Sequence, residues 1–223
     1  MSDVKIIDVK ATVTEVNDKR ADILRDNLKK NNTYMVNLMS SPGSGKTTLL
    51  IALLNKLKDK LKIGVMEADL DADVDTHAIK NYTGCDVIQL HTGGCCHLDA
   101  VMSKEGLDNL DKDLDLVFIE NVGNLICPAE FDTGANLNIM ILSIPEGDDK
   151  PVKYPFIFSM VDACIFSKID TLKIFDFNID LAESHIKKLN DKVSFFPLST
   201  KTGDGIDTLA DYIYNKVKDY QSK

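Results

Sequence analysis

The chain alternates between short, continuously apolar segments and longer segments in which apolar residues recur every three to four positions. The first pattern is typical of strands covered on both faces, and the second of helices with one buried face. The predicted strands are Tyr34–Met39, Ile63–Glu67, Val87–Leu90, Leu116–Glu120, Asn138–Ser143, Ala163–Ser167 and Val193–Leu198. The predicted helices between them cover residues 47–61, 75–82, 98–110, 177–189 and 205–219. The alternation predicts a three-layer α/β fold with a mainly parallel sheet of about seven strands.

Residues 1–32 precede this alternation and are mostly polar and charged, with helical spacing between Val16 and Leu28. We expect an N-terminal helical extension that lies outside the main core. The remaining residues, 33–223, show no internal repeat and no linker. A length of 223 residues suits one domain.

The sequence SPGSGKTT at Ser41–Thr48 stands between the first predicted strand and a leucine-rich helix. Strand, glycine-rich loop, Lys-Thr and helix together are typical of a phosphate-binding loop, and they indicate a P-loop NTPase fold. Ser40 holds the position of the first glycine of that motif. The alternative is a Gly/Ser-rich turn followed by a chance Lys-Thr pair.

The loop residues have separate expected roles. Glycine permits backbone angles that aim successive N–H groups at one anion, and the start of the helix adds its positive dipole end. The Lys46 ammonium can reach the β- and γ-phosphates, and the Thr47 hydroxyl can ligate Mg²⁺. The expected nucleotide contacts are Gly43, Ser44, Gly45, Lys46, Thr47 and Thr48.

Carboxylates follow two other predicted strands. Glu120 ends the strand Leu116–Glu120, and in phosphate-loop enzymes an acid at this place holds Mg²⁺ directly or through water. Gly123 follows it and can offer an N–H group to the γ-phosphate. Asp69 is a further candidate for Mg²⁺. Asp75 either orients the attacking water or caps the next helix, while Asp71 and Asp73 are expected to be solvated.

The segment Ser167-Lys168-Ile169-Asp170 resembles the guanine-reading segment of GTPases, with Ser167 in the place of the usual Asn. The Asp170 carboxylate would accept two N–H bonds from guanine, and the Lys168 stem would cover the base. A second base-contacting loop is expected after the last strand, at Ser199, Thr200 and Lys201. The alternative is a Lys-Asp turn at the surface.

Cysteine and histidine form a candidate metal site at Cys96, His97 and Cys127, with Cys95 as an additional candidate. Thiolate and imidazole are good ligands for Zn²⁺ and acceptable ligands for Ni²⁺. One chain offers only three or four metal-ligating side chains. A metal shared between two chains would have enough ligands. The alternative is that these cysteines are small apolar core residues.

Net charge and hydropathy indicate which classes of binding partner the chain is not expected to have. A net charge of −9 argues against nucleic acid, and no apolar run reaches the length of a membrane span. The N-terminus has no apolar signal segment. We expect a cytoplasmic protein, and therefore reduced cysteines that favour metal binding over disulfides.

Four segments together carry a resemblance to a known family: Ser40–Thr48, Cys96–Ala100, Glu120–Pro128 and Glu146–Pro151. They resemble HypB, the SIMIBI-class P-loop GTPase family of nickel insertion into [NiFe]-hydrogenase. The resemblance runs from about Arg20 to Tyr214.

The resemblance implies a GTP-hydrolysing metallochaperone, with GTP bound as its Mg²⁺ complex and Ni²⁺ or Zn²⁺ at Cys96, His97 and Cys127. The phosphate-loop motif and the strand-end residues, independently of the resemblance, predict the catalytic residues Lys46, Asp75, Glu120 and Gly123. The resemblance also implies a GTP-dependent homodimer, with Lys153 at the dimer face. The implied partners are a hydrogenase large-subunit precursor and an accessory nickel chaperone. Two alternatives stay open: a nucleotide-gated metal-binding module, and an accessory GTPase of urease or cobalamin-enzyme maturation.

Overall fold

The computed structural model describes residues 9–69 and 74–223. Within them, seven strands form one sheet in the order β3-β2-β4-β1-β5-β6-β7, and every neighbouring pair is parallel. The strands are β1 Tyr34–Ser40, β2 Ile63–Asp69, β3 Asp86–His91, β4 Leu116–Glu120, β5 Leu137–Ser143, β6 Ala163–Ser167 and β7 Ser194–Pro197. All seven predicted strands are confirmed, and the sheet is parallel throughout.

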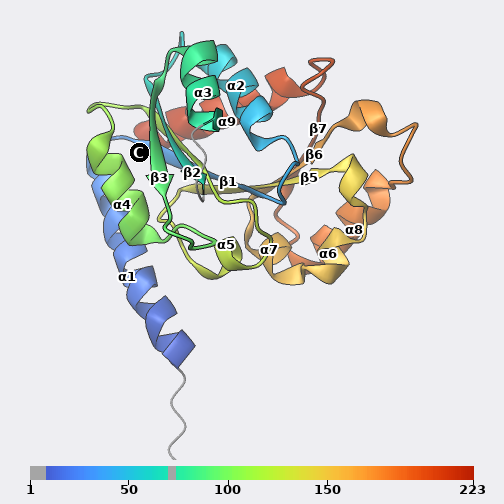
Figure 1. Ribbon diagram of the computed structural model, residues 1–223, viewed down its shortest axis with the longest axis horizontal. Coiled ribbons are helices and arrows are strands. Elements are labelled where there is room, and N and C mark those ends of the chain that lie inside the picture. Colours follow the sequence, from blue (N-terminus) through green and yellow to red (C-terminus); the bar gives the residue numbers. More distant parts are fainter. Residues whose placement is uncertain (1–8, 70–73) are drawn as a thin grey trace, which may run out of the picture.

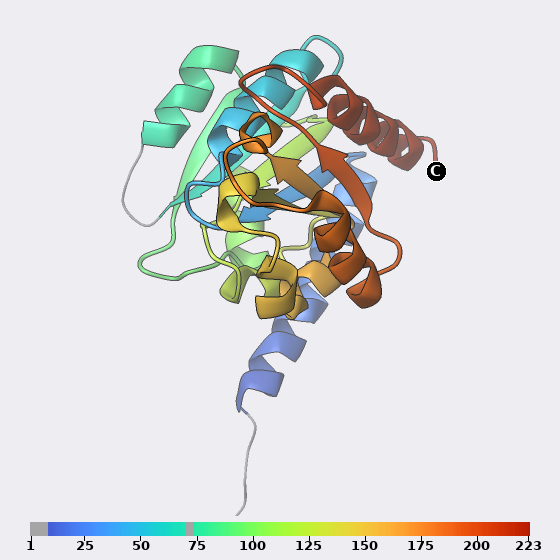
Figure 2. The ribbon, with the colours of Figure 1, turned by 90° about the vertical axis from the view of Figure 1, so that its right-hand side faces the viewer.

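Helices cover both faces of the sheet (Figures 1 and 2). They are α1 Val9–Lys30, α2 Lys46–Leu57, α3 Val74–Thr83, α4 Ala100–Asn109, α5 Cys127–Glu130, α6 Lys150–Lys153, α7 Pro155–Met160, α8 Ile179–Leu189 and α9 Ile206–Gln221. In Figure 1, α2, α3 and α9 lie above the sheet, and the remaining helices lie beside and below it. No helix in the described ranges is long and apolar enough to cross a bilayer.

The central strands are apolar on both faces because both faces are covered. In β1, Val36 and Leu38 belong to the core cluster that also contains the buried leucines of α2 and α9. Met35 and Met39 of the same strand belong to clusters on the opposite face. The three-layer α/β prediction is therefore confirmed.

The N-terminal helix is confirmed, but the expectation that it lies outside the main core is wrong. Ala21, Leu24 and Leu28 are at most 2% exposed, and Leu24 and Leu28 belong to the core cluster beneath β1, β2 and β4. Their spacing places all three on one face of the helix, which packs beside α4. Only the first turns of α1 project from the body of the molecule (Figures 1 and 2).

Candidate nucleotide and metal sites

The phosphate-binding loop connects the end of β1 to the start of α2. Gly43 and Gly45 have φ angles of 74° and 97°, a left-handed conformation that side chains resist. Ser40, which replaces a glycine of the motif, forms hydrogen bonds with two residues of the loop. Its hydroxyl oxygen accepts hydrogen bonds from the Lys46 ammonium at 2.9 Å and the Ser44 hydroxyl at 2.6 Å.

A cavity of about 460 Å³ opens beside this loop, at the carboxyl ends of β1, β2 and β4. Ligands of open parallel sheets bind at this edge. Its lining includes most of the residues that the sequence predicts for phosphate and catalysis, and it consists of Pro42, Gly43, Gly45, Lys46, Thr47, Thr48, Glu67, Ala68, Asp75, Glu120, Asn121, Val122 and Gly123.

Carboxylates surround Lys46. Burial lowers the pKa of its ammonium, and the negative charges of Glu120, Asp75, Glu146 and Glu67 act in the opposite direction. The Lys46 ammonium therefore lies close to several carboxylates, in the cavity where the negatively charged triphosphate of a nucleotide would bind.

Thr47 and Glu120 are joined directly. The Thr47 hydroxyl donates a 2.7 Å hydrogen bond to Glu120 Oε1, and Glu120 is 3% exposed. Both groups are oxygen donors of the kind that Mg²⁺ prefers. The structure does not describe the side chain of Asp69 or residues 70–73, so the predictions for Asp69, Asp71 and Asp73 lie outside the described residues.

Sequence reasoning missed Glu67. It is 3% exposed, lies opposite Glu120 in the register of β2 and β4, and accepts a 2.9 Å hydrogen bond from the Thr76 hydroxyl. Asp75 lies in the first turn of α3 and lines the same cavity. Two buried acids and Asp75 thus face Lys46 from two strands and a helix.

Gly123 approaches the phosphate-binding loop closely. A Cβ atom at this position would lie 3.0 Å from both N and Cα of Pro42. These are backbone atoms, so a larger residue at this position would force this segment or the loop to shift by a few tenths of an ångström.

The predicted base-contacting segment also touches the phosphate-binding loop. The Ser167 hydroxyl donates to the Ser44 carbonyl at 3.0 Å, and the Lys168 ammonium donates to the Gly43 carbonyl at 2.7 Å. Serine in place of the usual Asn therefore keeps a contact to the loop.

Asp170 is oriented by the last loop of the sheet. Its Oδ1 accepts a 2.6 Å hydrogen bond from the Ser199 hydroxyl, and its Oδ2 lies 3.9 Å from the Lys201 ammonium. Thr200 lies between these two residues in the same loop. The structure thus brings the two predicted base-contacting loops together.

Cys96, His97 and Cys127 come together although 30 residues separate the last two. One ligand atom from each lies within 4.8 Å of the others, and Cys96 Sγ is 3.9 Å from His97 Nδ1. Two thiols and an imidazole fit Zn²⁺ or Ni²⁺ and leave room for a further ligand. Cys95 is exposed and is not part of this group.

The protonation of two ligands differs. Burial lowers the pKa of His97, which keeps the imidazole neutral and able to bind a metal at neutral pH. A hydrogen bond with Cys96 raises the pKa of the Cys127 thiol, so a metal must displace its proton. The His97 ring stacks on Phe131 at 3.8 Å between centroids.

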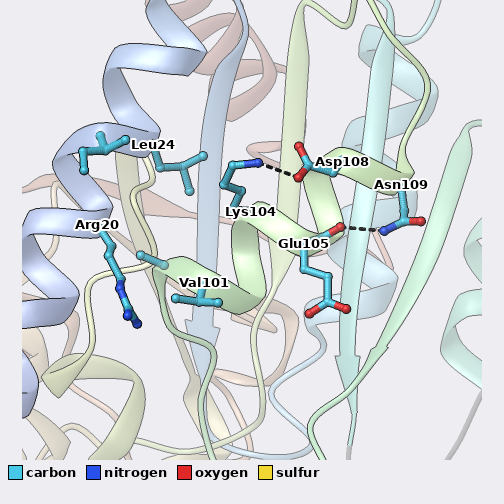
Figure 3. Close-up of a pocket in the computed structure, with 9 residues that line it drawn as sticks. Arg20, Leu24, Val101, Lys104, Glu105, Asp108 and Asn109 are labelled. Atoms are coloured by element: carbon cyan, nitrogen blue, oxygen red, sulfur yellow. Dashed lines mark hydrogen bonds and ion pairs between the residues drawn. The ribbon is translucent and has the colours of Figure 1, made fainter.

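A second cavity, of about 520 Å³, lies between α1 and α4. Figure 3 shows Arg20 and Leu24 of α1 facing Val101 and Lys104 of α4. None of the predicted site residues lines it. Lys153 lies elsewhere, at the end of α6, where it forms an exposed ion pair with Asp149.

Comparison with known proteins shows which family the chain resembles. Residues 34–197 match the family model "CobW/HypB/UreG, nucleotide-binding domain". The hydrogenase/urease maturation factor HypB of Helicobacter hepaticus is 42% identical over 224 residues, covering 98% of this chain and 91% of that protein.

Two solved structures are similar over most of the chain. HypB of Helicobacter pylori in complex with nickel has a TM-score of 0.86 at 37% identity, covering 91% of this chain and 95% of that one. HypB of Archaeoglobus fulgidus has a TM-score of 0.85 at 32% identity, covering 91% of this chain and 99% of that one. The chain therefore belongs to the CobW/HypB/UreG family of nucleotide-binding P-loop proteins, and within it to the HypB hydrogenase maturation factors.

Proposed function

We propose that this chain hydrolyses GTP and that hydrolysis times the delivery of nickel during [NiFe]-hydrogenase maturation. The observation that carries the proposal is the segment from Glu120 to Cys127. It begins at the acid bonded to Thr47, passes Gly123 against the phosphate-binding loop, and ends at a candidate metal ligand. A change at the γ-phosphate therefore has a path of eight residues, Glu120 to Cys127, to the metal site.

Hydrolysis transfers the γ-phosphoryl group of GTP to water and gives GDP and phosphate. Lys46 neutralises charge on the β- and γ-phosphates, and the Gly123 N–H group binds the γ-phosphate. Asp75 orients the water from the first turn of α3. Thr47, Asp69 and Glu120 would hold Mg²⁺, which would offset the negative charge of the phosphates.

Guanine selection rests on Asp170. Ser199 already donates to one carboxylate oxygen, so the carboxylate is held in place before the base arrives. Guanine presents two N–H groups to such a carboxylate and adenine does not. Ser167, Lys168, Thr200 and Lys201 complete the base-contacting surface.

Nickel is the proposed cargo, held by Cys96, His97 and Cys127. The similar H. pylori structure is a complex with nickel, and the donor set here fits Ni²⁺ as well as Zn²⁺. GTP binding favours a homodimer, in which a second chain adds donors to the metal and Lys153 lies at the interface. The hydrogenase large-subunit precursor and an accessory nickel chaperone are the partners.

Urease maturation is a second candidate destination for the metal. The H. hepaticus and H. pylori relatives are named as hydrogenase/urease maturation factors. A host with urease and without hydrogenase would favour it.

The metal site is tested by comparing Cys127, a proposed ligand, with Cys95, a cysteine outside the ligand group. Cys127→Ala is expected to weaken Ni²⁺ or Zn²⁺ binding by roughly 100-fold while GDP affinity stays nearly constant. Cys95→Ala is the matched control and is expected to bind metal as the wild type does. Unchanged metal binding by Cys127→Ala would return these cysteines to a purely structural role.

A further inference from the structure

Asn17 is a buried polar residue of α1, with 5% of its surface exposed. Its Oδ1 accepts a hydrogen bond from the Ala100 amide at 3.0 Å, and its Nδ2 donates to the Asp132 carbonyl at 2.9 Å. Ala100 opens α4 and Asp132 follows α5, so one side chain of the N-terminal helix joins two segments that are distant in the sequence.

These two segments carry the candidate metal ligands. Ala100 comes three residues after His97, and Asp132 comes five residues after Cys127. The stacking of His97 on Phe131 connects the same two segments. Two contacts therefore link the segments. The Asn17 amide links them next to α1, and the stacked rings of His97 and Phe131 link them next to the metal ligands.

Arg25 provides a comparison on the same helix. Its guanidinium forms an ion pair with the Asp132 carboxylate at 2.5 Å, and its Nε donates to the Ala135 carbonyl at 3.3 Å. Arg25 thus fastens the segment after α5 to α1, whereas Asn17 fixes that segment relative to the start of α4.

Apolar side chains of α1 and α4 share one core cluster, and this packing is the non-directional part of the interface. Figure 3 shows that the two helices face one another across the cavity lined by Arg20, Leu24, Val101 and Lys104. Dispersion and burial are non-directional, while a hydrogen bond fixes both distance and angle. Among the described residues, the Asn17 side chain is thus a directional contact of α1 that reaches both segments.

We propose that Asn17 is a positioning residue of the metal site, which sets the distance between the Cys96–His97 segment and Cys127. The inference rests on the proposed metal site. Metal–ligand distances tolerate errors of only about 0.2 Å, so ligands on two separate loops need such a brace. Groups outside the ligand shell typically change metal affinity by about 10- to 100-fold.

The test uses the full chain and Ni²⁺, titrated in competition with a chromophoric chelator. Asn17→Leu removes both hydrogen bonds at similar volume, and Asn17→Asp keeps the acceptor for Ala100 but loses the donor to Asp132. Arg20→Ala, on the same helix and facing the cavity, is the control. Asn17→Leu is expected to weaken Ni²⁺ binding by about 10-fold or more. We expect a smaller loss for Asn17→Asp, an altered thiolate-to-nickel absorption band for both, and no change for Arg20→Ala.

Affinity for GDP separates positioning from general damage. Wild-type Ni²⁺ affinity in Asn17→Leu would overturn the inference, as would an equal loss of GDP and Ni²⁺ affinity. If Asn17→Leu does not fold, Asn17→Asp decides the question by the same two affinities. If the wild type itself does not bind Ni²⁺, the proposed metal site is wrong. If the wild type binds Ni²⁺ and the Asn17 variant binds it equally well, only the inference about Asn17 is wrong.

Discussion

The Thr47 hydroxyl donates a 2.7 Å hydrogen bond to Glu120, so the phosphate-binding loop and the end of β4 are already joined at the place proposed for Mg²⁺. Both partners are oxygen donors, and Glu120 is almost fully buried. Nucleotide binding would change this hydrogen-bonded pair first, and Glu120 begins the segment that leads to Cys127.

Thr47→Val keeps the shape of the side chain and removes this hydroxyl. GTP hydrolysis in Mg²⁺ is expected to fall by roughly 100-fold or more, because the hydroxyl proposed to hold the charge-neutralising ion is lost. Steady-state phosphate release measures the effect, and Thr47→Ser is the control that keeps the hydroxyl. Hydrolysis by Thr47→Val at the wild-type rate would remove Thr47 from the Mg²⁺ site.

Gly123→Ala places a Cβ atom 3.0 Å from the backbone of Pro42. The segment must then shift by a few tenths of an ångström relative to the loop, which would weaken the proposed hydrogen bond from the Gly123 amide to the γ-phosphate. A hydrogen bond to a charged group contributes about 1.5–3 kcal/mol. We therefore expect GTP affinity to fall roughly 10- to 100-fold while GDP affinity changes little. Equal effects on both nucleotides, measured by calorimetry, would argue against a γ-phosphate contact.

Asp170→Asn changes the hydrogen-bond donors and acceptors that the side chain presents to the base. An amide can donate to the C2 oxygen of xanthine, whereas the native carboxylate is proposed to accept from the C2 amino group of guanine. The ratio of XTP to GTP affinity is expected to rise by at least roughly 100-fold. Competition binding against a fluorescent nucleotide measures that ratio. ATP hydrolysis by the wild type at the GTP rate would disprove the role of Asp170.

Metal affinity is expected to depend on pH through thiols more than through the imidazole. The hydrogen bond with Cys96 raises the pKa of Cys127, so metal binding at neutral pH releases its proton and weakens as pH falls. Burial lowers the pKa of His97, so its protonation competes only at more acidic pH. Cys127 should contribute about tenfold in apparent affinity per pH unit. Titrations at several pH values should show a slope smaller by one proton in Cys127→Ser, and an identical slope would exclude Cys127 as a ligand.

The sequence contained most of the fold and the phosphate-binding loop because these depend on local patterns. Continuous apolar strands and amphipathic helices follow from burial, and the loop motif carries its own backbone geometry. The helices α5, α6 and α7 were missed because four to six residues are too few to show a helical period. Their early prolines are the one local sign of them.

The rest depended on contacts between distant segments. Glu67 looked like an ordinary strand residue, and only the register of β2 against β4 places it beside Glu120. Cys95 and Cys96 are adjacent in the sequence, and the turn that carries them decides which thiol joins His97 and Cys127. The bonds of Asn17 reach 83 and 115 residues along the chain, so no local pattern announces them. The cytoplasmic location and the division at residue 33 remain predictions.

The central claim is that hydrolysis at the phosphate-binding loop controls release at the Cys96–His97–Cys127 site. The most direct measurement loads the protein with Ni²⁺ and follows its transfer to a chelator after addition of Mg²⁺ with GTP or with a non-hydrolysable GTP analogue. We expect GTP to accelerate transfer and the analogue to hold the metal on the protein. Equal transfer with both nucleotides would contradict the account, because release would then need binding and no hydrolysis.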